Sequence, residues 1–224
     1  MARNNTTLTG LLLLTAIPVV AGATRLGELT GGARITEENA RFFHSPVPIV
    51  VHIVGATLFC VLGAFQVTGH RRGHGRLGRV VLLPAGMAAA LSGLWMTLAY
   101  DLPEWDSALL NAFRLVFGIG MAVSLYLGYR AVRRRNFRSH QRWMLWGYAI
   151  GLGAGTQVLT VGPFAVALGH QPGGLLRALA MAAGWLINLA VAEWYLRSRA
   201  AGSRRSRHES DRAGTVRPAG KLAA

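Results

Sequence analysis

Six apolar stretches, each long enough to cross a bilayer, constrain this chain more than any other feature of its sequence. Hydrocarbon about 30 Å thick requires about 20 helical residues, because a helix rises about 1.5 Å per residue. The stretches also lack the two-residue alternation that is typical of a membrane β-barrel. We therefore predict an all-α protein, a polytopic transmembrane helical bundle with six spans over residues 6–24, 47–67, 80–100, 109–129, 143–164 and 174–196.

The first of these stretches also has features of a secretory signal peptide. Arg3 gives it a weakly basic start, and Ala21-Gly22-Ala23 is similar to a cleavage site. Because five further spans follow, we expect the first helix to be retained, although cleavage stays open as an alternative.

The distribution of charge predicts how the spans are oriented. The chain combines 52% hydrophobic residues with a formal net charge of +15. Most of the basic residues lie in the connections at 71–79 and 130–142 and after residue 196. Basic residues collect on the cytoplasmic side, so we predict that both termini are cytoplasmic. Six of the nine acidic residues lie in the opposite loops, namely Glu28, Glu37, Glu38, Asp101, Glu104 and Asp106.

The spans and charges divide the chain into three regions. Residues 1–40 hold the first helix and an outer loop, residues 41–197 form a five-helix membrane domain, and residues 198–224 form a basic tail that we expect to be disordered. This tail lacks aromatic residues and follows a membrane helix, so we expect no nucleic-acid partner. The basic residues instead favour contact with anionic lipids at the cytoplasmic face. Cys60 is the only cysteine, which excludes a disulfide scaffold.

Polar residues within the outer part of the spans indicate a candidate ligand site. Ionisable groups in hydrocarbon are costly, so each is a functional candidate. The helical rise places these residues in one layer, about 5–11 Å below the outer boundary. A positively charged pocket there would suit an anionic, lipid-like or quinone-like ligand. Structural roles stay open: the arginines could reach the acidic outer loops, and the others could join helices by hydrogen bonds. The candidates are His52, Asn111, Arg114, Gln157 and Arg177.

A second group of polar residues lies near the inner ends of the spans. Glu193 could form an ion pair with Arg79 or Arg142. Of the seven histidines, only His74 and His140 share a depth at which they could serve as axial ligands of one b-type haem. No zinc motif is present, and we predict no bound cofactor, with haem or quinone as alternatives. The inner-face motif comprises His74, Arg79, His140, Arg142, Trp143 and Glu193.

Glycines in the fifth span indicate where helices approach closely. Gly147, Gly151 and Gly155 follow one another at intervals of four residues. Small residues at this spacing let helix backbones approach in lipid, where association depends on close contact.

Several short motifs resemble a known family. They are Arg41-Phe42-Phe43-His44-Ser45-Pro46, His52-Ile53-Val54-Gly55-Ala56, Leu62-Gly63-Ala64-Phe65-Gln66, His74-Gly75-Arg76-Leu77-Gly78-Arg79, Ser92-Gly93-Leu94, His140-Gln141-Arg142-Trp143-Met144 with Tyr148-Ala149, and the ending Asn188 to Tyr195. Over residues 41–197 they resemble a bacterial family of predicted membrane proteins, catalogued as domain of unknown function twenty-three zero six. The chain departs from the family pattern at Gly75, Trp146 and Gln157. The resemblance implies a multi-pass protein of the bacterial plasma membrane with no established activity.

Three functional hypotheses follow. The first is a membrane protein that binds a small anionic or lipid-like ligand in the outer polar pocket. The second is a redox protein with one haem or a quinone. The third is a non-catalytic partner of another membrane protein. A homo-oligomer is a separate possible assembly, and finding it alone would weaken this third hypothesis. The sequence shows no phosphate-binding loop or nucleophile elbow, so we favour a role other than catalysis.

Overall fold

The computed structural model describes the backbone of residues 2–37, 39–69, 74–103 and 105–215, and the side chains of 5–37, 39–69, 75–103 and 105–201. All regular structure within these ranges is helical. The elements are α1 (Ala2–Gly31), α2 (Ala40–His44), α3 (Pro46–Val67), α4 (His74–Leu77), the π-helix η1 (Gly78–Leu82), α5 (Leu83–Ala99), α6 (Ala108–Arg133), α7 (Phe137–Gly151), α8 (Gly153–Leu168) and α9 (Gly174–Thr215). Six stretches of these ranges are long and apolar enough to cross a membrane, which confirms the predicted fold class.

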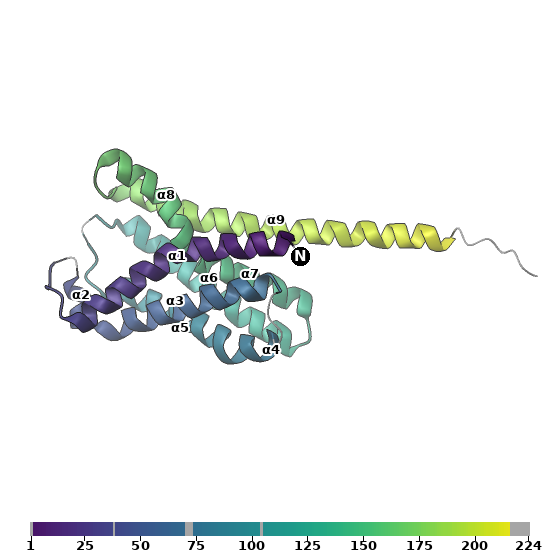
Figure 1. The fold of residues 1–224 in the computed structure, drawn as a ribbon, viewed down its shortest axis with the longest axis horizontal. Helices are drawn as coiled ribbons and strands as arrows, with labels where there is room; N and C mark the ends of the chain where they lie inside the picture. Colours follow the sequence, from purple (N-terminus) through teal and green to yellow (C-terminus); the bar gives the residue numbers. More distant parts are fainter. Residues whose placement is uncertain (1, 38, 70–73, 104, 216–224) are drawn as a thin grey trace, which may run out of the picture.

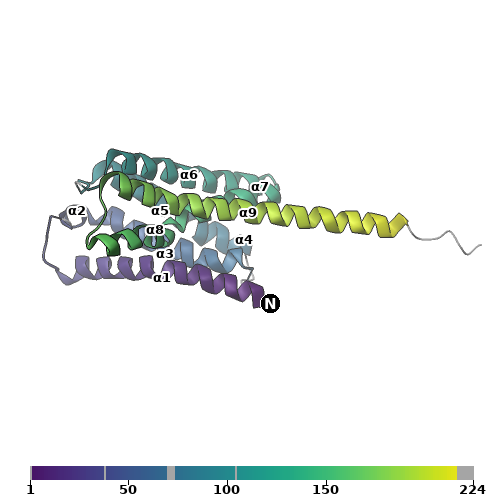
Figure 2. The same ribbon diagram turned by 90° about the horizontal axis from the view of Figure 1, so that it is seen from above.

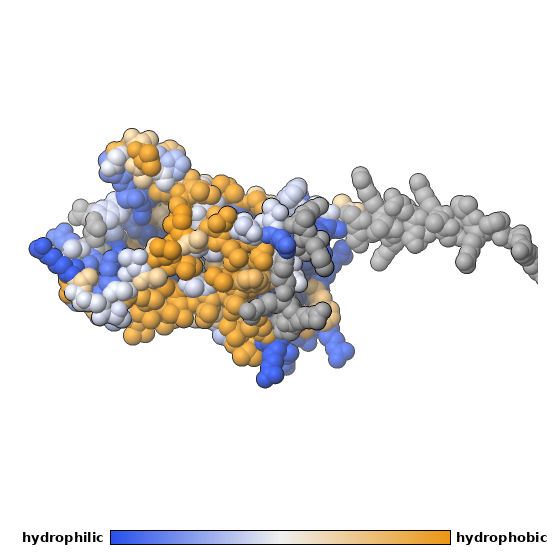
Figure 3. Space-filling model, in the orientation of Figure 1, coloured by the Kyte–Doolittle hydropathy of each residue, from blue (hydrophilic) through white to orange (hydrophobic). Residues whose placement is uncertain are grey.

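The helices form one bundle in which neighbours in sequence are neighbours in space. The closest pairs are α3 with α5, α5 with α6, α6 with α7, and α8 with α9, while α1 lies against α3 and α8. Short connections leave successive spans side by side, which accounts for this order. The surface shows an apolar band between two hydrophilic ends, as lipid requires (Figure 3).

The two ends of the bundle differ in what they carry. The end with α2 and the connections at 32–39 and 100–107 is called the outer end, after the orientation that the charges predict. The other end, with α4 and the connection between α6 and α7, is called the inner end. Figures 1 and 2 show the chain's first residues at the inner end, from which α9 also extends. The start of α1 and the extension of α9 therefore lie on one side of the bundle. That this side is cytoplasmic stays a prediction.

Helix α9 continues well beyond the bundle. The sequence predicted disorder from residue 198, whereas the backbone is helical through Thr215 (Figure 2). Alanine, arginine and glutamate are good helix formers, and a helix that has already begun in the membrane extends without a new nucleation step. Residues 216–224 of the predicted tail lie outside the described residues.

The predicted fifth span, expected to be a single helix, is divided at Leu152 into α7 and α8. Glycines flank this residue on both sides, and their weak helix propensity allows the break. A side chain at Gly153 would overlap the indole of Trp185, and one at Gly155 would overlap the backbone carbonyl of Leu14. The break and the close approaches to α9 and α1 are thus consequences of the same glycine-rich sequence.

The three spaced glycines of this span contact three different helices. Gly147 lies against Leu125 of α6, Gly151 against Phe59 of α3, and Gly155 against Leu14 of α1. The spacing predicted close contact between helices, and each of the three glycines makes such a contact. Because the span breaks at Leu152, the contacts are made with three separate helices.

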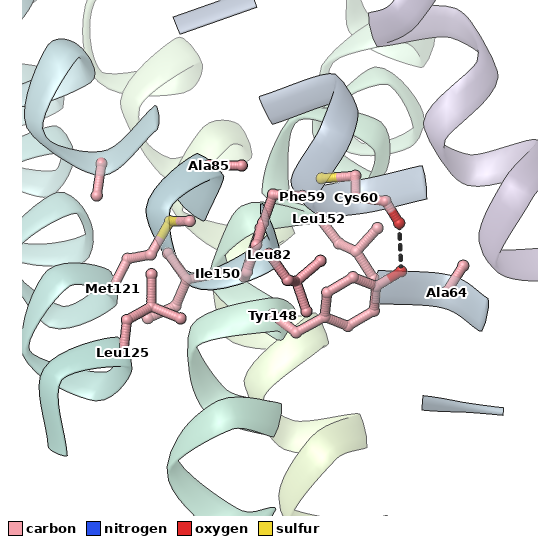
Figure 4. Close-up of a cluster of buried hydrophobic side chains, with 11 residues drawn as sticks. Phe59, Cys60, Ala64, Leu82, Ala85, Met121, Leu125, Tyr148, Ile150 and Leu152 are labelled. Atoms are coloured by element: carbon pink, nitrogen blue, oxygen red, sulfur yellow. Dashed lines mark hydrogen bonds between the residues drawn. The ribbon is translucent and has the colours of Figure 1, made fainter. Parts of the chain in front are cut away.

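A buried apolar core lies within the bundle. Phe59 and Leu125 are fully buried, and the rings of Phe59 and Tyr148 meet edge to face with centroids 5.8 Å apart. The Tyr148 hydroxyl donates a 2.9 Å hydrogen bond to the carbonyl of Cys60, which satisfies a polar group that would otherwise be costly to bury (Figure 4). Lipid is as apolar as these side chains, so the core stabilises the fold mainly through close contact.

Candidate functional site

An outer cavity of about 410 Å³ opens between α3, α5, α6, α8 and α9. His52, Arg114 and Gln157 line it, so three of the five predicted outer residues share one space. Phe59 forms part of its apolar inner boundary. A neighbouring hollow of about 340 Å³ between α1, α3 and α8 also includes His52, and it extends the space toward α1.

Asp106 organises the charges of this cavity. Its carboxylate is 3% exposed and accepts from Arg114 at 2.8 Å and from Arg177 at 2.9 Å. The arginine side chains are 22% and 17% exposed. One buried carboxylate therefore joins the second turn of α6 to the first turn of α9, and it balances one of two positive charges. The expectation that both arginines would reach outer acidic residues is met at Asp106, while Glu104 lies outside the described residues.

Local structure fixes Asp106 in this position. Ser107 is the N-cap of α6, and its hydroxyl accepts a hydrogen bond from the amide of Leu110 at 3.2 Å. The amide of Gly174 donates to the carbonyl of Trp105 at 3.1 Å, so the start of α9 is tied to the residues just before α6. Arg177, which does not line the cavity, thereby comes within reach of Asp106.

Asn111 supports Arg114 and does not line the cavity. Its side-chain oxygen accepts a 3.0 Å hydrogen bond from Arg114. The two residues lie three apart and therefore on one face of the helix. The guanidinium is held by an amide and a carboxylate, which leaves further N–H donors of this five-donor group for other contacts.

His52 and Gln157 join helices across the cavity wall. The Nδ1 of His52 lies 2.9 Å from the carbonyl of Ala89 and therefore carries a proton. In the neutral ring Nε2 is then an acceptor. The amide nitrogen of Gln157 donates to the carbonyl of Met181 at 3.1 Å. Each side chain thus has an interhelical role, and each also lines the cavity.

Arg41 is a cavity residue that the sequence analysis did not assign to the site. Its guanidinium lies over the ring of Phe42 at 4.6 Å and donates to the Asp101 carbonyl at 3.4 Å. Burial lowers the pKa of Arg41, and the nearby Asp106 carboxylate opposes this shift. The predicted loop position gave no sign that α2 would turn this residue toward the spans. The aromatic neighbour Phe42 was the one available signal.

The lining of the outer cavity combines charged and aromatic side chains. Arg41 and Arg114 line it with one carboxylate, Asp106, so the lining carries one net positive charge. Phe117 and Trp185 stack at 4.7 Å and add an aromatic wall. No group of three or more histidine, cysteine, aspartate or glutamate side chains suited to a metal occurs in the described part of the chain.

The inner-face motif forms a looser arrangement. Glu193 accepts from Arg197 at 2.9 Å and lies 3.6 Å from Arg142. Of the two predicted partners, Arg142 therefore pairs with Glu193, whereas Arg79 donates to the Gly75 carbonyl at 3.0 Å. Trp143 packs edge to face on Trp146, and Arg142 lies over the Trp146 ring at 4.9 Å.

The haem hypothesis depends on His74 and His140. His140 uses Nδ1 to donate to the Gly128 carbonyl at 2.8 Å, which leaves Nε2 with its lone pair. His74 begins α4 at the same end, but its side chain lies outside the described residues. The single-haem alternative stays a prediction, as does the redox role that depends on it.

The architecture defines a class of protein, a helical multi-pass membrane protein with polar groups buried inside its bundle. A family model described as a predicted membrane protein, DUF2306, matches residues 49–196, well over half of the chain. The chain therefore belongs to this family, as the sequence motifs indicated. No curated protein and no solved structure matches it.

Proposed function

We propose that this membrane protein binds a small anionic ligand with an apolar body in the outer cavity. The observation that carries this proposal is the excess of arginine around one carboxylate. Asp106 is shared by Arg114 and Arg177, and Arg41 lines the same space. An anion entering the cavity would offset positive charge that the protein itself leaves unbalanced.

Desolvation increases the benefit of such a ligand. Burial of Arg41 disfavours its charged form, so the guanidinium gains from a nearby negative charge that replaces lost water. Arg114 keeps donors beyond those used by Asp106 and Asn111. A carboxylate or phosphate oxygen is the acceptor that matches planar guanidinium groups.

The shape of the cavity supports a ligand that is larger than a bare ion. Its volume of about 410 Å³ lies within the range of about 300–1,000 Å³ that is usual for small-molecule sites. Phe59, Phe117 and Trp185 provide apolar contact below the charged residues. The hollow toward α1 gives a lipid-like ligand a route from the side. We place the protein in the bacterial plasma membrane, with this cavity facing outward.

The fluorescence of Trp185 provides a direct test. Purified protein in nanodiscs of zwitterionic lipid is titrated with benzoate and, separately, with the neutral benzamide. We expect benzoate to change the tryptophan emission of the unaltered protein and to leave that of a Trp185→Phe variant unchanged. Benzamide should bind more weakly. Arg41→Gln should weaken benzoate binding about tenfold, as expected for loss of a charge-assisted contact.

A matched control separates the site from general charge. Arg130 lies on α6 at the opposite end from Arg114, and Arg130→Gln removes the same charge. This variant should bind benzoate like the unaltered protein. Asp106→Asn should strengthen benzoate binding, because it removes the one carboxylate that lines the cavity among the described residues. Equal binding of benzoate and benzamide, or equal loss in the Arg41 and Arg130 variants, would contradict the proposal.

A further inference from the structure

A second cavity of about 650 Å³ opens at the inner end, between α3, η1, α5, α6 and α7. Phe59 is the one residue that lines both this inner cavity and the outer cavity. Phe59, whose ring packs edge to face on that of Tyr148, therefore lies between the two spaces. Both side chains belong to the buried core (Figure 4). The inner cavity is not used by the proposed outer site.

The charge at the inner cavity differs from that of the outer one. Arg79 and Arg133 line it, and no carboxylate does so among the described residues. Within the same residues neither arginine has an ion-pair partner, since the ion pairs there involve other arginines. Arg79 uses Nε for the Gly75 carbonyl and keeps its terminal nitrogens for other acceptors. The cavity mouth is thus positively charged and uncompensated.

Gln66 adds a hydrogen-bond donor that lacks an acceptor. Its amide nitrogen is buried and has no hydrogen-bond partner within the described residues. Gln66 lines the inner cavity in the last turn of α3, close to Gly78 of the π-helix. Unpaired buried donors are costly, and π-helical segments are frequent at functional sites. An acceptor in the cavity would complete the hydrogen bonding of Gln66 after a small rotation of the amide.

The deep part of the inner cavity is apolar. Phe59, Gly63, Leu82 and Tyr148 line it where it approaches the core. A side chain at Gly63 would overlap the Tyr148 ring, so this glycine is needed for the wall to form. The cavity therefore has a cationic mouth and an apolar interior, the two properties that an amphiphile with an anionic head requires.

We propose that the inner cavity binds an anionic amphiphile, with its carboxylate or phosphate head at Arg79 and Arg133 and its alkyl chain directed toward Phe59. Gln66 donates to the same head. The proposal commits to this chemistry because positive charge, an orphaned donor and an apolar interior converge from four elements. Two kinds of molecule have an anionic head and an alkyl chain: a free fatty acid, or an anionic phospholipid of the surrounding leaflet.

Direct binding measurements distinguish the two sources. Full-length protein in phosphatidylcholine nanodiscs is titrated with radiolabelled palmitate, and methyl palmitate serves as the neutral probe. A second set of nanodiscs contains phosphatidylglycerol, and the melting temperature is recorded. Saturable palmitate binding that the ester does not compete supports the proposal with a fatty acid as ligand. A melting shift that depends on phosphatidylglycerol, without palmitate binding, supports it with a phospholipid.

Variants locate the bound head and chain. The double variant Arg79→Gln/Arg133→Gln should raise the Kd for palmitate by about tenfold or more. If phosphatidylglycerol is the ligand, the melting shift should fall by the amount that corresponds to the same loss of affinity. The control Arg130→Gln/Arg138→Gln removes two arginines of the same end that do not line the cavity. It should behave like the unaltered protein.

A steric variant keeps the test decisive if the double variant fails to fold. A Cβ atom at Gly78 would meet Gln66 at ordinary contact distances of 3.6 and 3.7 Å, and the longer side chain of Gly78→Leu adds bulk beside Gln66 at the mouth. It should abolish binding while the helical content and melting temperature without ligand stay unchanged. The proposal is overturned if palmitate does not bind and phosphatidylglycerol does not shift the melting temperature. Equal effects of the cavity and control double variants, or full binding by Gly78→Leu, overturn it as well.

Discussion

The two ends of the bundle both combine arginine with one carboxylate, but they do so in different surroundings. At the outer end, Asp106 is 3% exposed and holds two arginines that are themselves largely covered. At the inner end, Glu193 is 26% exposed, and its partners Arg142 and Arg197 are 53% and 79% exposed. The inner pairs are therefore the more exposed ones, and the electrostatic interaction of exposed pairs is weaker than that of buried charges.

This contrast shows that burial, more than the number of ion pairs, decides what an arginine does in this protein. The outer cluster fixes the geometry of a cavity and joins α6 to α9. The inner pairs lie on the surface, and the arginines of the inner cavity stay without a carboxylate. The outer end is therefore built to hold a defined charge arrangement, and the inner end to present positive charge.

The largest expected effect comes from removing the wall between the two cavities. Phe59→Ala should lower the free energy of unfolding by about 3–5 kcal/mol, because it deletes a fully buried ring and leaves a cavity. It also joins the outer and inner spaces. Titration with SDS, followed by circular dichroism, measures the change. A loss below about 1 kcal/mol would show that the bundle collapses around the gap.

The outer cluster should show the next largest effect. Asp106→Asn leaves Arg114 and Arg177 without their shared carboxylate and should cost about 3 kcal/mol, the lower end for a broken buried pair. The same unfolding titration measures it. Conversely, an unchanged stability would remove the main difference between the two ends.

Asn188 connects three helices of the bundle by hydrogen bonds. Asn188 accepts from Thr156 at 2.7 Å and donates to the Ala149 carbonyl at 3.0 Å, so it connects both halves of the broken fifth span to α9. Asn188→Ala should lower the free energy of unfolding by about 1 kcal/mol, the typical value for hydrogen bonds between membrane helices. Hydrogen exchange should increase around Leu152. Exchange that increases equally in α3 would contradict a local role.

The smallest effect is expected at the inner surface. Arg142→Gln removes a partner of Glu193 that lies 3.6 Å away and is half exposed. The melting temperature should remain unchanged, because exposed ion pairs contribute little. Differential scanning fluorimetry compares it with Asp106→Asn in one experiment. A drop as large as that of the Asp106 variant would mean that the inner pairs are as important as the outer cluster.

Much of the fold could be predicted from the sequence because lipid permits few solutions. Helices satisfy their own backbone hydrogen bonds, so apolar length alone indicates each span. The second span, predicted at 47–67, is observed at Pro46–Val67. The break at Leu152 was not predicted, since glycine spacing predicts close contact without specifying which helix makes it. The helical extension after residue 198 was missed because charge composition alone suggested disorder.

The candidate site was predictable in its depth and not in its pairing. The helical rise places His52, Arg114 and Gln157 in one layer, and the structure gathers them around one cavity. Which acid would serve Arg114 and Arg177 could not be known, because Asp106 belongs to a loop whose position depends on the contact between Trp105 and Gly174. Arg41 was missed because its position relative to the spans also depends on tertiary contacts.

The sequence by itself determined that this chain is a helical membrane protein of six spans, because burying an apolar run of this length in lipid leaves the helix as the stable form. It also determined membership of the family. Tertiary structure alone decided that two arginines share Asp106, that Phe59 separates two cavities, and that Arg79 and Arg133 have no carboxylate partner in the described residues. These features depend on distances between helices, and the local pattern of a chain does not specify such distances.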